Sequence, residues 1–318
     1  MRIIRGLHHL ESLHSGCVLT IGNFDGLHLG HLAVIEKLSA RGHNLGLPVV
    51  VMIFEPQPLE YFLKDNAPPR LTRLREKVIQ FAKLPIDVLL IAHFNERFAN
   101  LDAGYFVDDI LINKLNVKHL VVGDDFHFGK ARCGNFAMLK DKGQQHGFSV
   151  EDTGSYLTQG LRVSSTLIRD ALAAGDLTQA EQLLGRSYSV CGRVAHGGKR
   201  GRTIGFPTAN IKMFRKISPI RGVFAVTVTG LDDLELAGIA NVGTRPTVDG
   251  SAEVILETHI FDFDRDIYGR YIEVHFKQKI RDELRFQSLE QLQDQIKRDV
   301  AETKKQLQKR VQVNDHGL

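Results

Sequence analysis

The hydrophobic pattern changes near residue 185, and this change limits the fold more than any other feature of the chain. Before it, short apolar runs of strand length alternate with longer amphipathic stretches of helical period. This alternation predicts an α/β domain with a parallel sheet and right-handed crossovers. After it, strand-like runs are separated by Gly, Asp and Pro turns, which is typical of a small antiparallel barrel or sandwich.

A length of 318 residues is about twice that of a usual domain, which supports two compact units. We therefore expect domains at 1–184 and 185–309, and a frayed tail at 310–318. The strands predicted in the first domain are 18–21, 49–54, 88–91 and 119–122, and its helices are 31–40, 74–81, 105–115 and 136–145. Asp102 is a candidate N-cap of the third helix. The strands predicted in the second domain are 223–229, 236–242, 254–261 and 271–276, followed by one helix with Ser288 and Gln291 in a capping-box pattern.

Charge is distributed unevenly along the chain. The formal net charge is +4, but residues 1–184 are nearly neutral and 185–318 carry the excess of Lys and Arg. Asp and Glu are absent from 182–231, where nine basic residues occur: Arg186, Arg193, Lys199, Arg200, Arg202, Lys212, Arg215, Lys216 and Arg221. Such a segment is suited to meet an anion.

The three cysteines, Cys17, Cys133 and Cys191, lie far apart and form no CxxC pair. This spacing predicts neither a disulfide framework nor a zinc site and fits a reducing compartment. The N-terminus lacks an apolar segment typical of a signal peptide, and no stretch approaches the roughly 18 apolar residues of a membrane span. We expect a soluble cytoplasmic protein.

The loop after the first predicted strand, Gly-Asn-Phe-Asp-Gly-Leu-His-Leu-Gly-His at 22–31, leads directly into a helix. Glycines let a ligand approach the backbone, and the helix N-terminus offers free N–H groups to phosphate oxygens. His28 and His31 could both reach one polyphosphate. A histidine pair near a helix start is more often structural than catalytic, but the strand-loop-helix context favours a phosphate site.

This loop resembles the signature of the nucleotidylyltransferases, in the form found in the FMN adenylyltransferase half of bacterial bifunctional riboflavin kinase/FAD synthetases. Further blocks similar to that family follow in its order: Phe54-Glu55-Pro56 with Pro58, Arg70-Leu71-Thr72, the Gly-Asp-Asp-Phe-His-Phe-Gly run at 123–129, and the Ser-Ser-Thr-Leu-Ile-Arg run at 164–169. The resemblance implies a Rossmann-like nucleotidylyltransferase domain that transfers the adenylyl group of ATP to FMN.

By this resemblance, His28 and His31 are catalytic and bind the triphosphate of ATP. The other residues implied to bind ATP are Gly22, Phe24, Asp25, Gly26, Gly30, Asp125, Ser164, Ser165, Thr166 and Arg169. Ser164 and Thr166 are equally suited to cap a helix, and Asp125 to cap a turn. His127 and Leu167 stand where the family commonly has Arg, so two positive charges are missing and FMN affinity or its pH dependence is expected to differ.

A second constellation begins with the glycine-rich, basic run at 192–202 and continues into Thr-Ile-Gly-Phe-Pro-Thr-Ala-Asn at 203–210. Alone, the basic loop would be interpreted as a solvated hairpin. With the following segment it resembles the flavokinase signature, as do 222–224, 241–247, 257–259, 268–269 and 281–286. The resemblance spans about residues 17–300 and implies a six-stranded riboflavin kinase β-barrel with a C-terminal helix.

Within this barrel, Glu257 is implied to be the general base for the riboflavin 5′-hydroxyl. Thr208 and Asn210 match the pair that binds Mg²⁺ and ATP phosphates, and hard oxygen ligands suit that ion. Further residues implied to bind ATP are Gly197, Lys199, Gly201, Arg202 and Gly205. Arg281 and Phe286 match a flap over the flavin, although Phe286 is equally suited to anchor the core. Phe224 stands where the family often has Tyr.

We therefore expect a bifunctional enzyme that converts riboflavin to FMN and FMN to FAD, with ATP as co-substrate and Mg²⁺ as cofactor. A transferase acting on another phosphate ester is the competing enzyme, against which the flavokinase signature argues. A barrel that binds RNA would also explain the basic segment, but the spaced aromatic pattern of single-strand binders is missing. We expect small-molecule substrates, no nucleic acid and no membrane partner; the oligomeric state is left open.

Overall fold

The computed structural model describes residues 1–10, 15–123, 125–154, 156–158, 160–197, 205–232, 235–246 and 252–315. The chain divides into two compact units. Unit 1 comprises Met1–Pro68 and Thr72–Val163, and unit 2 comprises Pro69–Leu71 and Ser164–Leu318. The longer segment of unit 2 thus begins at Ser164, whereas the sequence predicted a boundary between 184 and 185. The reason is local packing, because a Cβ added at Gly175 would lie 2.4 Å from Cδ of Lys279 on a barrel strand.

Unit 1 is built on a six-stranded parallel sheet. Its strands are β1 (Arg2–Arg5), β2 (Cys17–Ile21), β3 (Val49–Glu55), β4 (Val88–His93), β5 (Val117–Val122) and β6 (Ser149–Asp152). The strand order is β1-β4-β3-β2-β5-β6, so the direction in which strands are added reverses between β2 and β5. Ligands of open parallel sheets bind at such a reversal, outside the carboxyl ends of the strands.

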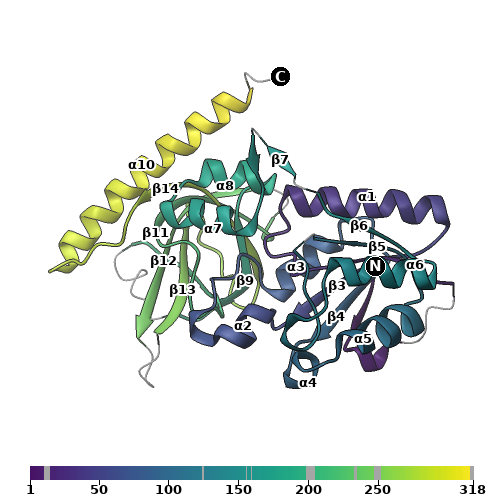
Figure 1. Ribbon diagram of the computed structural model, residues 1–318. Helices are drawn as coiled ribbons and strands as arrows, with labels where there is room; N and C mark the ends of the chain where they lie inside the picture. Colours follow the sequence, from purple (N-terminus) through teal and green to yellow (C-terminus); the bar gives the residue numbers. More distant parts are fainter. Residues whose placement is uncertain are drawn as a thin grey trace. The chain divides into compact units, whose positions relative to one another are not determined.

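Helices cover both faces of this sheet (Figure 1). They are α1 (Leu29–Leu45), α2 (Pro58–Leu63), α3 (Leu74–Phe81), α4 (Glu96–Ala99), α5 (Ala103–Tyr105), the π-helix η3 (Phe106–Lys114) and α6 (Phe136–His146), with short 3₁₀ turns η1 (Leu7–His9), η2 (Lys64–Asn66) and η4 (Lys130–Arg132). Side chains of α1 and α3 pack on one face and those of η3 and α6 on the other. The strands are therefore buried on both sides, which explains their continuous apolar runs.

The four strands predicted in this unit are confirmed, and so are the helices at 31–40, 74–81 and 136–145. The segment predicted as a helix at 105–115 is a π-helix preceded by a single α-turn, and Asp102 caps that turn by accepting the Tyr105 N–H at 3.1 Å. Strands β1 and β6 were not predicted. Only one side chain of β1 is buried, so its sequence carries little hydrophobic signal.

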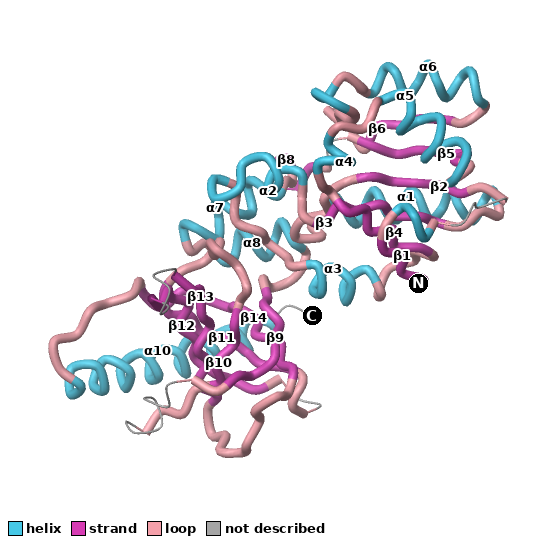
Figure 2. Tube along the Cα trace, turned by 90° about the horizontal axis from the view of Figure 1, so that it is seen from below, coloured by secondary structure: helices cyan, strands magenta, loops and turns pink. Residues whose placement is uncertain are grey.

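Unit 2 contains a closed antiparallel barrel with strand order β10-β13-β12-β11-β14-β9 (Figure 2). Its strands are β9 (Ser189–Ala195), β10 (Ala209–Lys212), β11 (Gly222–Thr229), β12 (Leu236–Pro246), β13 (Ala252–Ile260) and β14 (Tyr271–Arg281). Two helices of unit 2, α7 (Ser165–Ala174) and α8 (Leu177–Leu184), precede the barrel in the chain. The last elements of unit 1 are the paired strands β7 (Leu157–Thr158) and β8 (Leu161–Arg162). The predicted six-stranded barrel is confirmed.

The last helix, α10 (Leu289–Asp315), packs on the barrel through Val300 and Leu307, which contact a small cluster of Val223, Ile239 and Phe261. Ser288 accepts the Gln291 N–H at 3.3 Å, as the capping pattern predicted. The Gln291 side chain accepts from the Gln287 N–H, one residue before the position that a capping box requires. The helix continues to Asp315, through part of the stretch 310–318 that was expected to be a frayed tail, and residues 310–315 contain no Gly or Pro.

The cysteines are all free thiols, as predicted. Burial raises the pKa of the Cys17 thiol to about 12. No group of three or more His, Cys, Asp or Glu side chains suited to hold a metal ion is found among the described residues. Within the same residues, no helix combines the length and apolar character that crossing a membrane requires.

A buried ion pair ties α10 to the barrel. Arg281 at the end of β14 donates to both carboxylate oxygens of Asp299, at 2.7 to 3.0 Å, and the exposed fractions of the two side chains are 19% and 4%. Gln295 also donates to Asp299, at 2.8 Å. This is the bidentate geometry that makes arginine–carboxylate contacts strong.

Replacing Asp299 by Ala should lower the free energy of unfolding of unit 2 by about 3 kcal/mol, because Arg281 keeps its charge in a largely buried place without its partner. Urea unfolding measures the change. Asp294→Ala is the matched control, since Asp294 pairs with Lys297 on the exposed side of the same helix and should change stability very little. Equal losses from both substitutions would contradict the structural role of the pair.

Candidate active sites

The loop 22–28 joins the end of β2 to the start of α1. His28 is the N-cap of α1, and its Nδ1 accepts the backbone N–H of His31 at 3.3 Å. The two imidazole rings stack with centroids 3.6 Å apart and planes at 13°. The structure therefore brings together the two histidines that the sequence singled out, at a helix N-terminus beside the strand-order reversal.

The loop backbone has an unusual conformation. Phe24, Gly26 and Leu27 have φ values of 47°, 87° and 41°, in the left-handed region that L side chains rarely adopt. Gly22 and Gly30 leave room for rings, because an added Cβ would lie 3.1 Å from the Phe24 ring and 3.3 Å from the His28 ring, respectively. Phe24 packs between His31, at 4.9 Å, and Phe81, at 5.7 Å between centroids.

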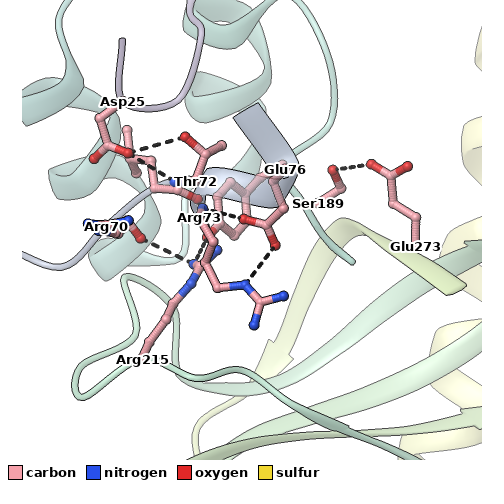
Figure 3. A network of polar contacts seen from close by, with 10 residues as sticks. Asp25, Arg70, Thr72, Arg73, Glu76, Ser189, Arg215 and Glu273 are labelled. Atoms are coloured by element: carbon pink, nitrogen blue, oxygen red, sulfur yellow. Dashed lines mark hydrogen bonds and ion pairs between the residues drawn. The ribbon is translucent and has the colours of Figure 1, made fainter. Parts of the chain in front are cut away.

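Asp25 anchors this loop to the segment before α3. Its Oδ1 accepts from the backbone N–H of Thr72 at 3.0 Å and from the Thr72 hydroxyl at 3.2 Å (Figure 3). The Gly26 N–H donates to Thr72 Oγ1 at 2.9 Å. Only 2% of Asp25 is exposed. Asp25 was predicted among the residues that bind ATP; in this structure its carboxylate holds the loop conformation.

Asp125 follows β5, the strand that lies next to β2 across the strand-order reversal. The residue is exposed, and its backbone carbonyl accepts from Nδ1 of His127 at 2.8 Å. A Cβ added at Gly123 would lie 2.7 Å from Asp125 Oδ1, so that glycine leaves room for the carboxylate. His127, where a family arginine was expected, is thus held within its own loop.

A cavity of about 590 Å³ in unit 1 is lined by aromatic side chains. The rings that line it come from β3, α2, the segments around α4 and η3, and the loop after β5: Phe54, Tyr61, Phe62, Phe94, Phe98, Phe106, Phe126 and Phe128. Lys130 and Arg132 add positive charge at its edge, and His127 also lines it. Our sequence reasoning missed this cavity, because its aromatic residues are scattered over 54–128 without a common spacing.

The Ser-Ser-Thr-Leu-Ile-Arg run forms the start of α7 in unit 2. Ser164 is the N-cap and accepts the Leu167 N–H at 3.2 Å, as the capping alternative predicted. Ser165 and Thr166 occupy the first helical positions. Arg169 donates from Nε to the Pro69 carbonyl at 2.8 Å, so part of its guanidinium already supports the short segment 69–71.

In the barrel, Thr208 and Asn210 line a cavity of about 200 Å³, together with Gly197 and the turn 263–268. Asn210 Nδ2 donates to the Thr208 carbonyl at 3.1 Å, which leaves its carbonyl oxygen available as a ligand. Gly197 leaves room for the Asn210 amide, because an added Cβ would lie 2.5 Å from it. Gly205 is exposed with a φ of 83°. Lys199, Gly201 and Arg202 lie outside the described residues.

Glu257 lies on β13 between two asparagines on neighbouring strands. It is in register with Asn210 of β10 on one side and Asn241 of β12 on the other, so all three side chains share one face of the barrel wall. Residues 254, 256, 258 and 260 of β13 are buried, and Glu257 belongs to the alternate, half-buried set. The carboxylate is therefore next to the asparagine predicted to bind phosphate.

Arg281 and Phe286, predicted in the flavin flap, lie near each other, with the guanidinium 5.9 Å from the ring centroid. The Arg281 guanidinium is occupied by Asp299 and, through Nη1, by the Asp282 carbonyl at 2.8 Å. Phe286 is half-buried rather than part of the core, which argues against the core-anchor alternative.

The basic segment is partly used inside unit 2. Arg215 is buried and donates to the Arg70 carbonyl at 3.2 Å (Figure 3). It also donates to the Tyr188 hydroxyl at 2.6 Å and to the Leu71 carbonyl at 3.2 Å. Lys212 and Arg221 form ion pairs with Glu253 and Glu283. The expectation that the whole segment meets an anion is therefore wrong for Arg215, which is buried against protein acceptors; for the exposed Lys212 and Arg221 it stays a prediction.

Comparisons with known proteins find matches for both halves of the chain. Residues 10–167 match the family model described as FAD synthetase, and residues 184–307 match the one described as riboflavin kinase. A bifunctional riboflavin kinase/FMN adenylyltransferase of Escherichia coli K12 is 51% identical over 300 residues, covering 94% of this chain and 96% of that protein. The protein of the same name from Haemophilus influenzae is 49% identical, covering 96% and 98%.

Among solved structures, the chain resembles one described as a macrolide-efflux protein from Streptococcus pneumoniae. The TM-score is 0.80 at 30% sequence identity, and the match covers 96% of this chain and 99% of the other. That description is of the pneumococcal protein. The full-length identity to named relatives and the two family models together show that this chain belongs to the bifunctional riboflavin kinase/FMN adenylyltransferase family.

Proposed function

We propose that unit 2 phosphorylates riboflavin to FMN and that unit 1 adenylylates FMN to FAD, each with ATP. The observation that carries this assignment is the register of Glu257 with Asn210, since Asn210 lines a cavity together with Thr208 and Gly197. A carboxylate next to a phosphate-binding amide is the arrangement that phosphoryl transfer from ATP to a hydroxyl needs.

In the kinase reaction, the riboflavin 5′-hydroxyl oxygen forms a bond to the γ-phosphorus of ATP while the bond to the β–γ bridging oxygen breaks. Glu257 accepts the hydroxyl proton, and ADP leaves with the bridging oxygen. Asn210 and Thr208 bind the phosphates and fix the γ-phosphorus in line with the hydroxyl. Positioning and charge neutralisation provide most of the catalysis, since no covalent enzyme intermediate is needed.

Mg²⁺ fits the donor set of the barrel site. The Asn210 amide oxygen and the Thr208 hydroxyl are hard, neutral oxygen ligands, and they leave most of the coordination shell to substrate phosphates and water, as Mg²⁺ prefers. The bound ion would neutralise phosphate charge. The described residues offer no cluster of His, Cys, Asp and Glu that would select a softer metal.

In unit 1, a phosphate oxygen of FMN attacks the α-phosphorus of ATP, and pyrophosphate leaves. His28 and His31 stack at the N-terminus of α1, where they can neutralise the phosphates together with loop N–H groups. The ATP-binding role that the resemblance implies for Ser164, Ser165, Thr166 and Arg169 stays a prediction. All of these groups stabilise charge and none needs to form a bond to the substrate.

The aromatic cavity of unit 1 is the proposed site of the FMN isoalloxazine ring. Its volume of about 590 Å³ suits a tricyclic ring, and its wall of Phe and Tyr side chains offers stacking and edge contacts. His127 and Arg132 at its edge provide donors for the ribityl phosphate. Substrates of this composition are small molecules, so we propose that neither nucleic acid nor a lipid surface is a partner.

The purified protein, supplied with riboflavin, ATP and Mg²⁺, should form FMN first and FAD afterwards. Chromatography of the products over time measures both flavins. Supplying FMN with ATP should yield FAD and pyrophosphate without a lag. Absence of both products from a folded protein would contradict the proposed function, and FAD formed without transient FMN would contradict the order of the two steps.

Glu257→Gln should lower kcat for riboflavin phosphorylation by about a thousandfold, because the 5′-hydroxyl loses its proton acceptor. Conversion of supplied FMN to FAD should stay unchanged. Glu253→Gln is the matched control, since Glu253 lies on the same strand and faces an exposed lysine. Full kinase activity in Glu257→Gln would remove this residue from the mechanism.

His31→Ala should have the opposite effect: FMN adenylylation should fall by about a hundredfold or more as one charge-stabilising donor is lost, while riboflavin phosphorylation continues. His43→Ala, at the exposed C-terminal end of the same helix, should leave both rates at the wild-type level. If His31→Ala abolished both activities in a folded protein, the assignment of separate sites would be wrong.

A further inference from the structure

Lys77 of α3 is completely buried beneath the loop 22–28. Its exposed fraction is 0%, and its Nζ donates to the backbone carbonyl of Asn23 at 2.7 Å. Burying an ammonium group costs much more than burying a methionine of similar length. The mechanism proposed above gives this charge no task, and the sequence analysis did not single it out.

The contact fixes one peptide unit of the loop. In a trans peptide the carbonyl and the N–H point in opposite directions, so a carbonyl of Asn23 turned toward Lys77 turns the N–H of Phe24 away from α3. Within the described part of the chain, this N–H donates to no other group, although Phe24 is only 3% exposed. Buried N–H groups are nearly always paired, which indicates an acceptor supplied by a ligand.

Helix α3 supports the loop at neighbouring points. Lys77 and Phe81 are four residues apart and share one face of the helix. Phe81 packs against the Phe24 ring at 5.7 Å, and Phe24 in turn lies 4.9 Å from the His31 ring. Thr72, just before α3, holds Asp25. Of the three supporting side chains, Thr72, Lys77 and Phe81, Lys77 is the basic one, and it contacts the loop backbone at Asn23.

We propose that Lys77 is a positioning residue for adenylyl transfer. Its Nζ group holds the Asn23–Phe24 peptide so that the Phe24 N–H faces the nucleotide phosphate. This inference rests on the proposed adenylylation in unit 1. Lys77 acts through the loop backbone and touches no substrate atom.

The test compares Lys77→Met, Lys77→Arg and the control Lys83→Met, an exposed lysine just after α3. Lys77→Met should lower kcat for FMN adenylylation by about a hundredfold, which is the loss typical of one misplaced oxyanion donor. The KM for FMN and the rate of riboflavin phosphorylation should stay within about threefold of wild type. Lys77→Arg should recover part of kcat. Lys83→Met should match wild type in all of these values.

An unchanged KM for FMN shows that unit 1 is folded. If Lys77 had a purely structural role, its loss would change kcat and KM together. If wild-type protein makes FAD and Lys77→Met makes it equally fast, the inference is overturned while the proposed function stands. If wild-type protein fails to make FAD, the proposed function itself fails. If Lys77→Met does not fold, Lys77→Gln replaces it, because the glutamine amide keeps a hydrogen-bond donor. A wild-type kcat of Lys77→Gln, or a failure of this variant to fold, would show that Lys77 has a structural role only.

Discussion

The conformation of the loop 22–28 depends on contacts made beneath it, and the site of unit 1 depends on that loop. Asp25 and Gly26 bond to Thr72, the Asn23 carbonyl accepts from Lys77, and Phe24 packs on Phe81. These contacts hold two non-glycine residues at positive φ, a conformation that persists only where the surroundings impose it. The stacked histidines follow directly from that arrangement.

The barrel solves a similar problem by strand register. Asn210, Glu257 and Asn241 come from three adjacent strands, and antiparallel pairing places them side by side on one face. A shift of one residue in β13 would exchange Glu257 for a buried neighbour and remove the carboxylate from the row. The buried alternation of residues 254, 256, 258 and 260 prevents such a shift, so core packing and the position of the proposed base are coupled.

Much of the fold was predictable because the signals were local. Continuous apolar runs predicted the central strands, and Asp102, Ser164 and Ser288 cap helices as their sequence context indicated. Strand β1 was missed because an edge strand buries little. The π-helix at Phe106–Lys114 was missed because its hydrophobic pattern resembles that of an α-helix over so short a range. The role of Arg215 was also missed, since nothing local distinguishes an arginine that holds backbone carbonyls from one that meets an anion.

The sequence alone determined the two units, the histidine loop after the first strand of the sheet core, and the motifs by which the flavin family is identified, because these depend on contiguous residues. Only the tertiary structure decided that Asp25 anchors a loop, that aromatic rings from 54–128 surround one cavity, and that Lys77 is buried under the phosphate loop. Each of these depends on groups distant in sequence meeting in space. The hydrogen bonds and packing that result cannot be inferred from spacing along the chain.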